Sequence, residues 1–455
     1  MKKIVLILCL AALIVAFLFI PHTIELTGTL ETWFPYKGLT LYKDISMFHF
    51  PIGRFILVPL HLLSNWNLKL DPFLGLGVGL FSLYTIYIFG KKYLSPFGTI
   101  VAMLFFTTFF WYFATAILYY HEMLIGLLLG LALLVFYNLK TQKRQSSRLL
   151  FLLGLLLSLA EFSGQVASIT VFVFAILALV KFKFSRYLIC GLLTPPAILC
   201  LYFLSQNALA EFIYWNTAYY FITYASFTNT PLSELPWREL SAFFLPVGLL
   251  LVSFRQKLLL FLGLSTMPFI IFSIFHFHHL SYALPTMALL AGLATDSLPK
   301  SSQKYLSILI FCLLSFSIYS WHKQHIRPKI DFKIVNDVYP GDPMYSAIDW
   351  VKQNTNVSDK LMVFGDPLFY MRADRLPASR PAKSIPYSWE PLEPIINEIR
   401  STPADYWIVD RRSMDKIVQI YKKPKMAAFV DEELTAQYQV VATFEIWEIW
   451  KRINL

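Results

Sequence analysis

Charged residues are scarce in this sequence of 455 residues, where they make up 15% of the chain. A soluble globular domain carries about 25% charged residues. Hydrophobic residues account for 57% of the sequence, and its mean hydropathy is +0.56. This balance excludes an ordinary soluble enzyme, and it also excludes a disordered chain.

Cysteine is scarce as well. The four cysteines, Cys9, Cys190, Cys200 and Cys312, all lie within apolar runs, where a thiol behaves as a small hydrophobic group. This placement excludes a disulfide framework and a cysteine-based metal site. The sequence also lacks a Walker motif, zinc-finger spacing and the Ser/His/Asp order of a hydrolase.

Long apolar runs are what the sequence has in abundance. The runs are continuous and do not alternate with polar residues, so they predict helices and not strands. Each is close to the length that crosses a hydrocarbon core, for which about 17 to 25 residues are needed. We predict eleven spans, of which 149–161 is the shortest: 4–20, 72–90, 98–118, 122–139, 149–161, 165–180, 187–204, 239–254, 258–275, 281–297 and 304–320.

The basic residues predict the orientation of these spans. The N-terminus and the loops on its side of the membrane hold 15 Lys and Arg, whereas the opposite loops hold 5. Basic residues concentrate in cytoplasmic loops. We therefore expect the N-terminus on the cytoplasmic side of the cytoplasmic membrane and the C-terminal segment on its outer side. The net charge of +11 therefore reports topology and not nucleic-acid binding.

The chain divides into a transmembrane part and a polar part. We predict a multi-pass α-helical membrane domain over residues 1–320, with long outer loops at 21–71 and 205–238. The first twenty residues are expected to stay as an uncleaved helix, because no small-residue cleavage site follows them. Residues 321–455 alternate between helix-like and strand-like patterns and predict a small extracytoplasmic α/β domain.

Two features of the outer loops have more than one interpretation. Residues 51–63 are apolar but too short to span, which is typical of a helix lying in the membrane interface. The loop at 205–238 is rich in aromatic residues. These residues indicate either an aromatic belt at the level of the lipid headgroups or a groove for a lipid chain.

The first outer loop carries three short motifs. Glu31 comes early in it, a Tyr42-Lys43-Asp44 stretch follows, and Pro51-Ile52-Gly53 enters the apolar helix. Together with the architecture, this order resembles integral-membrane glycosyltransferases of the GT-C fold, and most closely the bacterial branch related to protein mannosyltransferases and aminoarabinose transferases. The stretch from Arg375 to Arg380 also looks like one that recurs in such proteins.

The resemblance implies transfer of a sugar from a polyprenyl-phosphate donor to an acceptor at the outer face. That reaction needs a carboxylate to take the proton of the attacking acceptor group. Glu31 matches the acidic residue that the family has in its first loop, although Asp is commoner there, and Asp44 is the second candidate. The alternatives are that Glu31 is solvated and that Asp44 caps a turn or pairs with Lys43 or Arg54.

Other polar residues of the outer loops are further candidates for the substrate site. Cationic groups stabilise a phosphate leaving group, which makes candidates of Arg54, Arg238, His278 and His279; each has lipid headgroups or interfacial water as its alternative partner. The remaining substrate-site candidates are His49, His121, Glu122, Glu161 and Tyr282. The alternative role of Glu122 is to cap a helix, and the alternative for Glu161 is a hairpin exposed to water. Three arginines of the C-terminal segment are expected in a solvated loop and less so over the acceptor: Arg372, Arg375 and Arg380.

A metal site is not assigned. His276, His278 and His279 lie close together, but no His-x-x-x-His or Glu-x-x-His pair fixes a ligand geometry. The sequence therefore predicts no metal ligands and leaves the participation of a divalent metal open.

We expect a membrane glycosyltransferase, with a hexose or a pentose as the transferred sugar and a protein, lipid or glycan as acceptor. A transporter or flippase is the main alternative. It would place ionisable groups near the middle of the membrane, and apart from Glu161 the predicted spans lack them. A non-catalytic membrane scaffold is the third possibility.

Overall fold

The chain folds into two compact units, each built from separate stretches of sequence. In this computed structural model the described residues are 2–19, 26–47, 49–66, 71–113, 121–142, 144–224, 237–253, 257–267, 277–301, 305, 343–380, 392–419 and 424–453. The first unit, here the helical unit, comprises Met1–Ile24, Phe50–Leu201 and Thr228–Val335. The second, here the mixed unit, comprises Glu25–His49, Tyr202–Phe227 and Asn336–Leu455.

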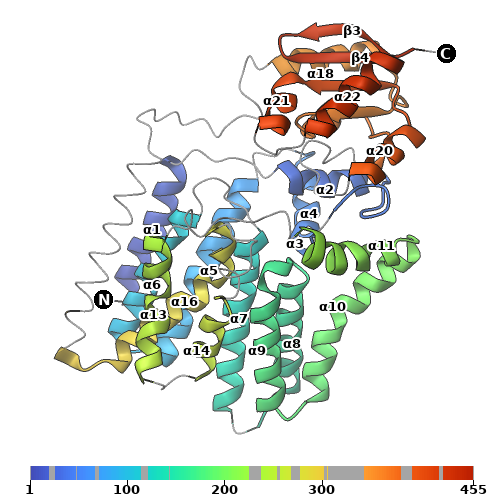
Figure 1. Cartoon of the computed structure of the whole chain (residues 1–455). Helices are drawn as coiled ribbons and strands as arrows, with labels where there is room; N and C mark the ends of the chain where they lie inside the picture. Colours follow the sequence, from blue (N-terminus) through green and yellow to red (C-terminus); the bar gives the residue numbers. More distant parts are fainter. Residues whose placement is uncertain are drawn as a thin grey trace. The chain divides into compact units, whose positions relative to one another are not determined.

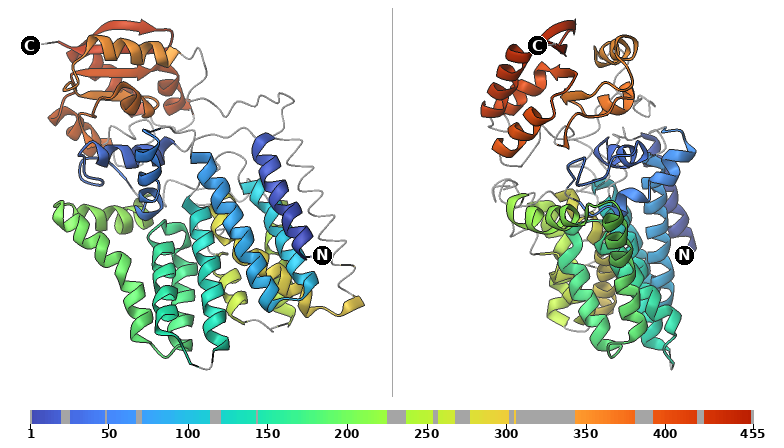
Figure 2. Two further views of the ribbon diagram at one scale, coloured as in Figure 1. Left: turned by 180° about the vertical axis from the view of Figure 1, so that it is seen from behind. Right: turned by 90° about the vertical axis from the view of Figure 1, so that its right-hand side faces the viewer.

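The helical unit is a bundle of apolar helices (Figures 1 and 2). Its helices are α1 (Lys2–Phe19), α3 (Ile52–Phe55), α4 (Val58–Leu63), α5 (Asp71–Tyr93), α6 (Pro96–Phe113), α7 (His121–Thr141), α8 (Ser147–Glu161), α9 (Ser168–Lys181), α10 (Arg186–Ser205), α13 (Trp237–Ser253), α14 (Lys257–Leu264) and α16 (Leu284–Ser297), with short 3-10 turns η2 (Gln165–Ala167) and η5 (Phe277–Ala283). The last residues of α10 belong to the mixed unit. These helices are those expected of an integral membrane protein.

Three described helices are long and apolar enough to cross a membrane, and they match three of the predicted spans. They are Phe73–Tyr93, His121–Thr141 and Arg186–Ser205. The short predicted spans at 149–161 and 165–180 correspond to α8 and α9, which meet at an angle of 116°. The full predicted number of eleven stays a prediction, because residues 306–320 and much of 258–275 lie outside the described residues.

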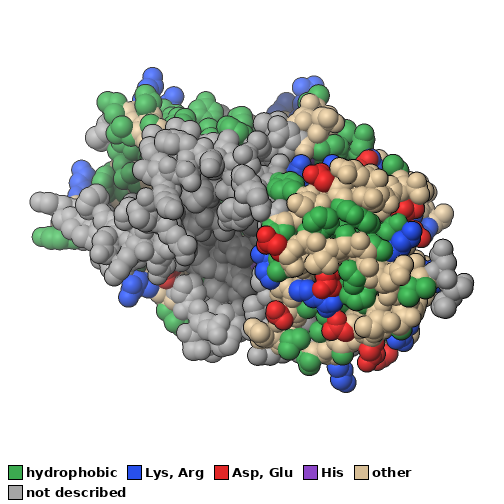
Figure 3. Space-filling view, turned by 90° about the horizontal axis from the view of Figure 1, so that it is seen from above, with side chains coloured by type: hydrophobic (Ala, Val, Ile, Leu, Met, Phe, Trp, Pro, Cys, Tyr) green, Lys and Arg blue, Asp and Glu red, His purple; other side chains and the backbone are tan. Residues whose placement is uncertain are grey.

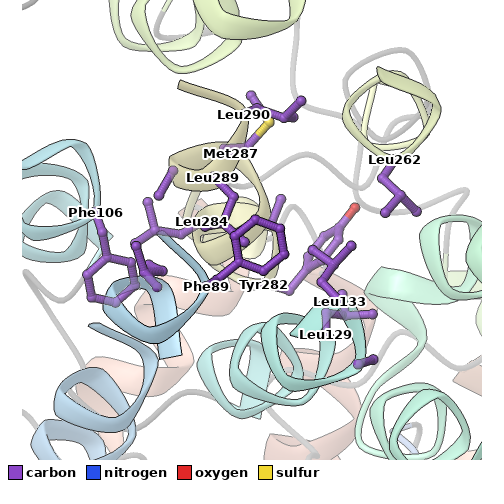
Figure 4. Packing of buried hydrophobic residues seen from close by; sticks show 14 of the residues in the cluster. Phe89, Phe106, Leu129, Leu133, Leu262, Tyr282, Leu284, Met287, Leu289 and Leu290 are labelled. Atoms are coloured by element: carbon purple, nitrogen blue, oxygen red, sulfur yellow. The ribbon is translucent and has the colours of Figure 1, made fainter. Parts of the chain in front are cut away.

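The core of the helical unit lies where α5, α6, α7 and α16 meet. Figure 4 shows the rings of Phe89 and Phe106 and the side chains of Leu129 and Leu133 around the start of α16. Met287 and its neighbours on α16 are fully buried in the same cluster. Helices that are apolar on all sides bury one side here and leave the other for lipid.

Two helices of this unit approach each other through glycine. A Cβ atom on Gly154 of α8 would lie 2.2 Å from the carbonyl oxygen of Leu188, and one on Gly191 of α10 would lie 2.2 Å from that of Phe151. Small residues at a membrane helix crossing allow this close contact of the two backbones. A side chain at either position must push the helices apart.

We expect Gly191→Ala to destabilise the protein by about 1 to 3 kcal/mol, as overpacking does. The matched control is Gly248→Ala in α13, where an added Cβ meets nothing within 4 Å. That change should stabilise the protein by about 0.4 to 1 kcal/mol, because alanine favours a helix over glycine. Unfolding midpoints of the two variants in the same detergent should move in opposite directions, and a shift of the same sign would contradict the close crossing.

The mixed unit contains a four-stranded sheet of order β1-β2-β4-β3. Strands β1 (Leu361–Phe364) and β2 (Tyr406–Asp410) are parallel, whereas β4 (Trp447–Arg452) is antiparallel to β2 and to β3 (Tyr438–Phe444). The helices of the unit are α2 (Leu26–Tyr36), α11 (Leu209–Tyr214), the π-helical η3 (Trp215–Tyr224), α18 (Pro343–Asn354), α19 (Leu368–Ala373), α20 (Leu392–Ser401), α21 (Arg411–Gln419) and α22 (Pro424–Gln437). The predicted small C-terminal α/β region is thus confirmed.

The mixed unit extends beyond the C-terminal segment. Helix α2, from the first long loop, contacts α19 through an edge-to-face pair of Phe34 and Tyr370 and an ion pair of 2.7 Å between Lys37 and Asp374. The sequence boundary at residue 320 stays a prediction. Contacts in the structure group parts of both long loops with the C-terminal residues.

Arg375 has a structural role in this unit. Its guanidinium, in a residue only 4% exposed, donates to the carbonyl oxygens of Thr355, Ala373 and Asp374. These oxygens follow or end α18 and α19, where helix carbonyls lack partners. Nothing about this residue fits the solvated loop expected from the sequence. Elsewhere on the face of Figure 3, Lys and Arg mix with Asp and Glu, in keeping with the near-neutral C-terminal segment.

Both long outer loops predicted from the sequence contain helices. The apolar stretch at 51–63 is helical but breaks into α3 and α4 after Phe55. The aromatic loop at 205–238 begins with α11 and η3, and its residues 225–236 lie outside the described residues.

Candidate active site

Glu31 lies on α2 in the mixed unit and is buried, with 2% of its surface exposed. The neighbours Leu30, Thr32, Trp33 and Phe34 are buried as well. A carboxylate is costly to bury unless its environment stabilises the charge. Glu31 is therefore not the solvated loop carboxylate that the sequence left open as the alternative.

A tight turn follows α2 and carries Tyr42. The turn closes through a backbone bond from Tyr42 N to Ile45 O (2.9 Å), and Tyr42 itself has a φ of 70°, which is unusual for a side chain of this size. Its ring is buried against Phe203 and Phe212, and its hydroxyl donates to His49 O at 2.6 Å. The strained turn thus holds a phenol in a fixed place.

Tyr42 connects Glu31 to the π-helical segment. Burial raises the pKa of Tyr42 well above its usual value, a hydrogen bond with the Asn216 side chain lowers it, and the charge of Glu31 raises it further. Asn216 in turn donates to Phe212 O at 2.8 Å. The phenol therefore keeps its proton at neutral pH.

Asp44 is part of the same turn. Its carboxylate accepts a hydrogen bond of 2.7 Å from Thr40 N, and its own N–H donates to Thr40 O at 2.8 Å. This is the capping role that the sequence offered as an alternative. The hydrogen bonds of Asp44 close the turn, whereas Glu31 is buried within the unit.

A second cluster of predicted residues lies in the helical unit. His279 on η5 donates from Nδ1 to the Glu122 carboxylate at 2.8 Å, and His121 Nδ1 lies 3.4 Å from the other oxygen of Glu122. Glu122 is fully buried in the first turn of α7, where the helix dipole favours an acid. Three residues that the sequence proposed separately therefore form one charged cluster.

Glycines hold this cluster tightly. A Cβ on Gly53 would lie 2.7 Å from Ser163 O and 2.8 Å from the Cβ of His121, and one on Gly164 would lie 2.5 Å from the His121 ring. The Pro-Ile-Gly motif of the first loop therefore packs directly against the first turn of α7. Arg54 follows Gly53 on α3 and is buried, with 2% exposed.

The turn after α8 adds polar groups to the same region. Glu161, the last residue of α8, accepts a hydrogen bond of 2.5 Å from Ser168 Oγ. Gln165 accepts one of 3.2 Å from Phe50 N, next to the Pro-Ile-Gly motif. Tyr282 is buried and its hydroxyl lies 3.3 Å from Thr170 Oγ1.

The remaining candidates lie apart from these clusters. Arg238 is exposed in the first turn of α13. His49 is half-buried and contributes its carbonyl oxygen to Tyr42. His278 is a backbone position of η5 whose side chain is outside the described residues, as is all of His276.

Sequence reasoning missed several members of these clusters. Asn216 and Gln165 are single amides in apolar surroundings, and only the fold brings them beside the first loop. A polar amide in a run of aromatic residues is the signal that could have marked Asn216. Among the described residues, no group of three His, Cys, Asp or Glu side chains has the arrangement to hold a metal ion.

No protein-family model matches this sequence, and no match is found among curated proteins. Solved structures do match. ArnT from Cupriavidus metallidurans, bound to undecaprenyl phosphate, is 10% identical with a TM-score of 0.62, over 99% of this chain and 98% of ArnT. The archaeal oligosaccharyltransferase AglB from Archaeoglobus fulgidus, in complex with an inhibitory peptide and a dolichol-phosphate, is 11% identical with a TM-score of 0.53, over 100% of this chain and 74% of AglB.

A third match is the mycobacterial arabinofuranosyltransferase AftD, which is 11% identical with a TM-score of 0.53 over 100% of this chain and 42% of AftD. All of these proteins have the GT-C fold. The predicted GT-C resemblance is therefore confirmed at the level of the fold.

Proposed function

We propose that this chain is a membrane glycosyltransferase that moves a single sugar from a polyprenyl-phosphate donor to an acceptor on the outer face of the cytoplasmic membrane. The observation that carries the proposal is the buried Glu31 carboxylate beside Tyr42, in the first loop of a chain whose whole length has the GT-C fold. Two of the matched structures hold polyprenyl phosphates of this kind, undecaprenyl phosphate in ArnT and dolichol-phosphate in AglB.

In the proposed reaction an acceptor hydroxyl or amine attacks the anomeric carbon of the sugar. Its bond to that carbon forms as the bond from carbon to the phosphate oxygen breaks, and Glu31 takes the proton of the nucleophile. The polyprenyl phosphate leaves with the bonding electrons. Its negative charge needs cationic donors at a dry site, and the buried Arg54 stays a candidate for that role.

His279 is the second cationic candidate for the phosphate. Its Nδ1 lies 2.8 Å from a carboxylate oxygen of Glu122. Arg238 and His278 stay further candidates. The proposed orientation, with the N-terminus inside and the mixed unit outside, follows from the distribution of basic residues.

The test starts from lipids that purify with the protein. Mass spectrometry should find a polyprenyl phosphate carrying one hexose or pentose, which identifies the donor. Purified protein in lipid nanodiscs should then convert this donor to free polyprenyl phosphate and a glycosylated acceptor. Movement of the intact donor across liposomes without release of polyprenyl phosphate would instead support the transporter alternative.

A further inference from the structure

One residue of the C-terminal segment joins three parts of the mixed unit. Arg380 donates from Nη1 to Ser46 Oγ at 2.9 Å, and its carbonyl oxygen accepts from Ser46 N at 3.2 Å. Its Nη2 forms an ion pair of 2.8 Å with Glu398 on α20, and its own N–H donates to the other oxygen of Glu398 at 3.1 Å. Its guanidinium lies over the ring of Trp215, 4.9 Å from the centroid.

Two of the partners of Arg380, Ser46 and Trp215, are next to residues that contact Tyr42. Ser46 follows directly on the turn that Ile45 closes with Tyr42, and Trp215 precedes Asn216, which bonds the Tyr42 side chain. Arg380 therefore contacts two segments that flank the Tyr42 phenol, the turn and the π-helical segment. The phenol in turn lies close enough to Glu31 for their charges to interact.

The planar guanidinium of arginine suits a residue that contacts three segments at once. A guanidinium can stack on a ring with its face while its edge donates to a hydroxyl and a carboxylate, which an ammonium group cannot do. The side chain of Arg380 is 17% exposed and is not part of the sheet core. Its removal leaves the pair of Phe34 with Tyr370 and the ion pair of Lys37 with Asp374 in place to hold α2.

We propose that Arg380 is a positioning residue for the candidate base Glu31, acting through the turn of residues 40–46 and through Trp215. The effect on catalysis rests on the proposed function, whereas the ordering of the turn does not. The C-terminal segment thereby sets the geometry of the first loop.

The experiment uses the full-length protein in nanodiscs and measures amide hydrogen exchange together with sugar transfer. Arg380→Met removes the hydrogen bonds and the cation but keeps most of the side-chain volume. Exchange of the amides at 42–46 should rise by about tenfold or more, while the strands β1 and β2 keep their protection. The turnover number kcat should fall about 10-fold to 100-fold with little change in KM, because a less ordered Tyr42 phenol changes the surroundings of Glu31, which slows chemistry and not binding.

The matched control is Arg400→Met. Arg400 also pairs with a carboxylate, Glu433, and lies 5.4 Å from the centroid of the Phe429 ring, but it does not touch the first loop. The Arg400→Met variant should leave amide hydrogen exchange at residues 42–46 unchanged, and it should also leave kcat unchanged. Arg380→Lys should recover the ion pair and only part of kcat.

Two results would overturn the inference. If amide exchange at residues 42–46 is unchanged in Arg380→Met, Arg380 does not order the turn. If exchange increases but the variant keeps the kcat of an active wild-type enzyme, Arg380 does not position the base. If the wild-type protein transfers no sugar, the proposed function fails. Increased amide exchange at residues 42–46 in Arg380→Met still shows in that case that Arg380 orders the turn. Should Arg380→Met unfold, Ser46→Ala removes one bond to Arg380 and should raise exchange at 42–46 without affecting Trp215.

Discussion

Glu31→Gln should reduce the rate of sugar transfer by about 10² to 10⁴-fold, the usual contribution of a general base. The amide has the shape of the carboxylate but cannot accept the proton of the attacking group. Because the substitution leaves the binding groups in place, the loss should appear in kcat with little change in KM. The measurement is release of polyprenyl phosphate from the donor by purified variant and wild-type protein.

Asp44→Asn is the matched control, since it changes a carboxylate to an amide in the same loop. Its amide oxygen can still accept the bond from Thr40 N that closes the turn, so the rate should fall by less than about tenfold. A large loss in Asp44→Asn with an active Glu31→Gln would make Asp44 the base. Full activity in both variants would exclude both assignments.

The sequence predicted the apolar helices closely because their signal is local. The predicted span at 122–139 appears as α7 (His121–Thr141), and the one at 187–204 as α10 (Arg186–Ser205). The strand-like patterns predicted within residues 321–455 likewise include β2 (Tyr406–Asp410). In each case composition over a few turns or a few residues decides the structure.

The sequence did not predict the environment of Glu31, because that depends on distant contacts. Helix α2 contains Pro35 and was taken for a loop, yet Phe34 and Lys37 attach it to residues more than three hundred positions later. Tertiary packing outweighs local propensity at such a place. The same reason hid Arg380, which looked like a solvated arginine and instead bonds Ser46.

The cluster of Glu122, His121 and His279 in the helical unit shows what the sequence predicts and what it leaves open. The sequence selected Glu122, His121 and His279 because each is polar in a short loop between apolar runs. It could not pair Glu122 with His279, which are 157 residues apart. The sequence therefore identifies the polar residues of the site, whereas only the fold identifies their partners.

That pairing makes Glu122→Ala the change with the largest expected effect on stability. It leaves the His279 ring without its buried acceptor and removes the charge beside His121, so the free energy of unfolding should fall by about 3 to 5 kcal/mol. Glu239→Ala is the control, because Glu239 is also an acid in the first turn of a helix, α13, but is not fully buried. Its loss should cost at most about 1 kcal/mol.

Unfolding of both variants in mixed detergent micelles measures the difference, and a double-mutant cycle with His279→Ala isolates the pair. If the bond of 2.8 Å between His279 and Glu122 stabilises the fold, His279→Ala should cost far less in the Glu122→Ala background than in the wild type. Equal costs in the two backgrounds, or a Glu122→Ala variant as stable as Glu239→Ala, would contradict the pairing.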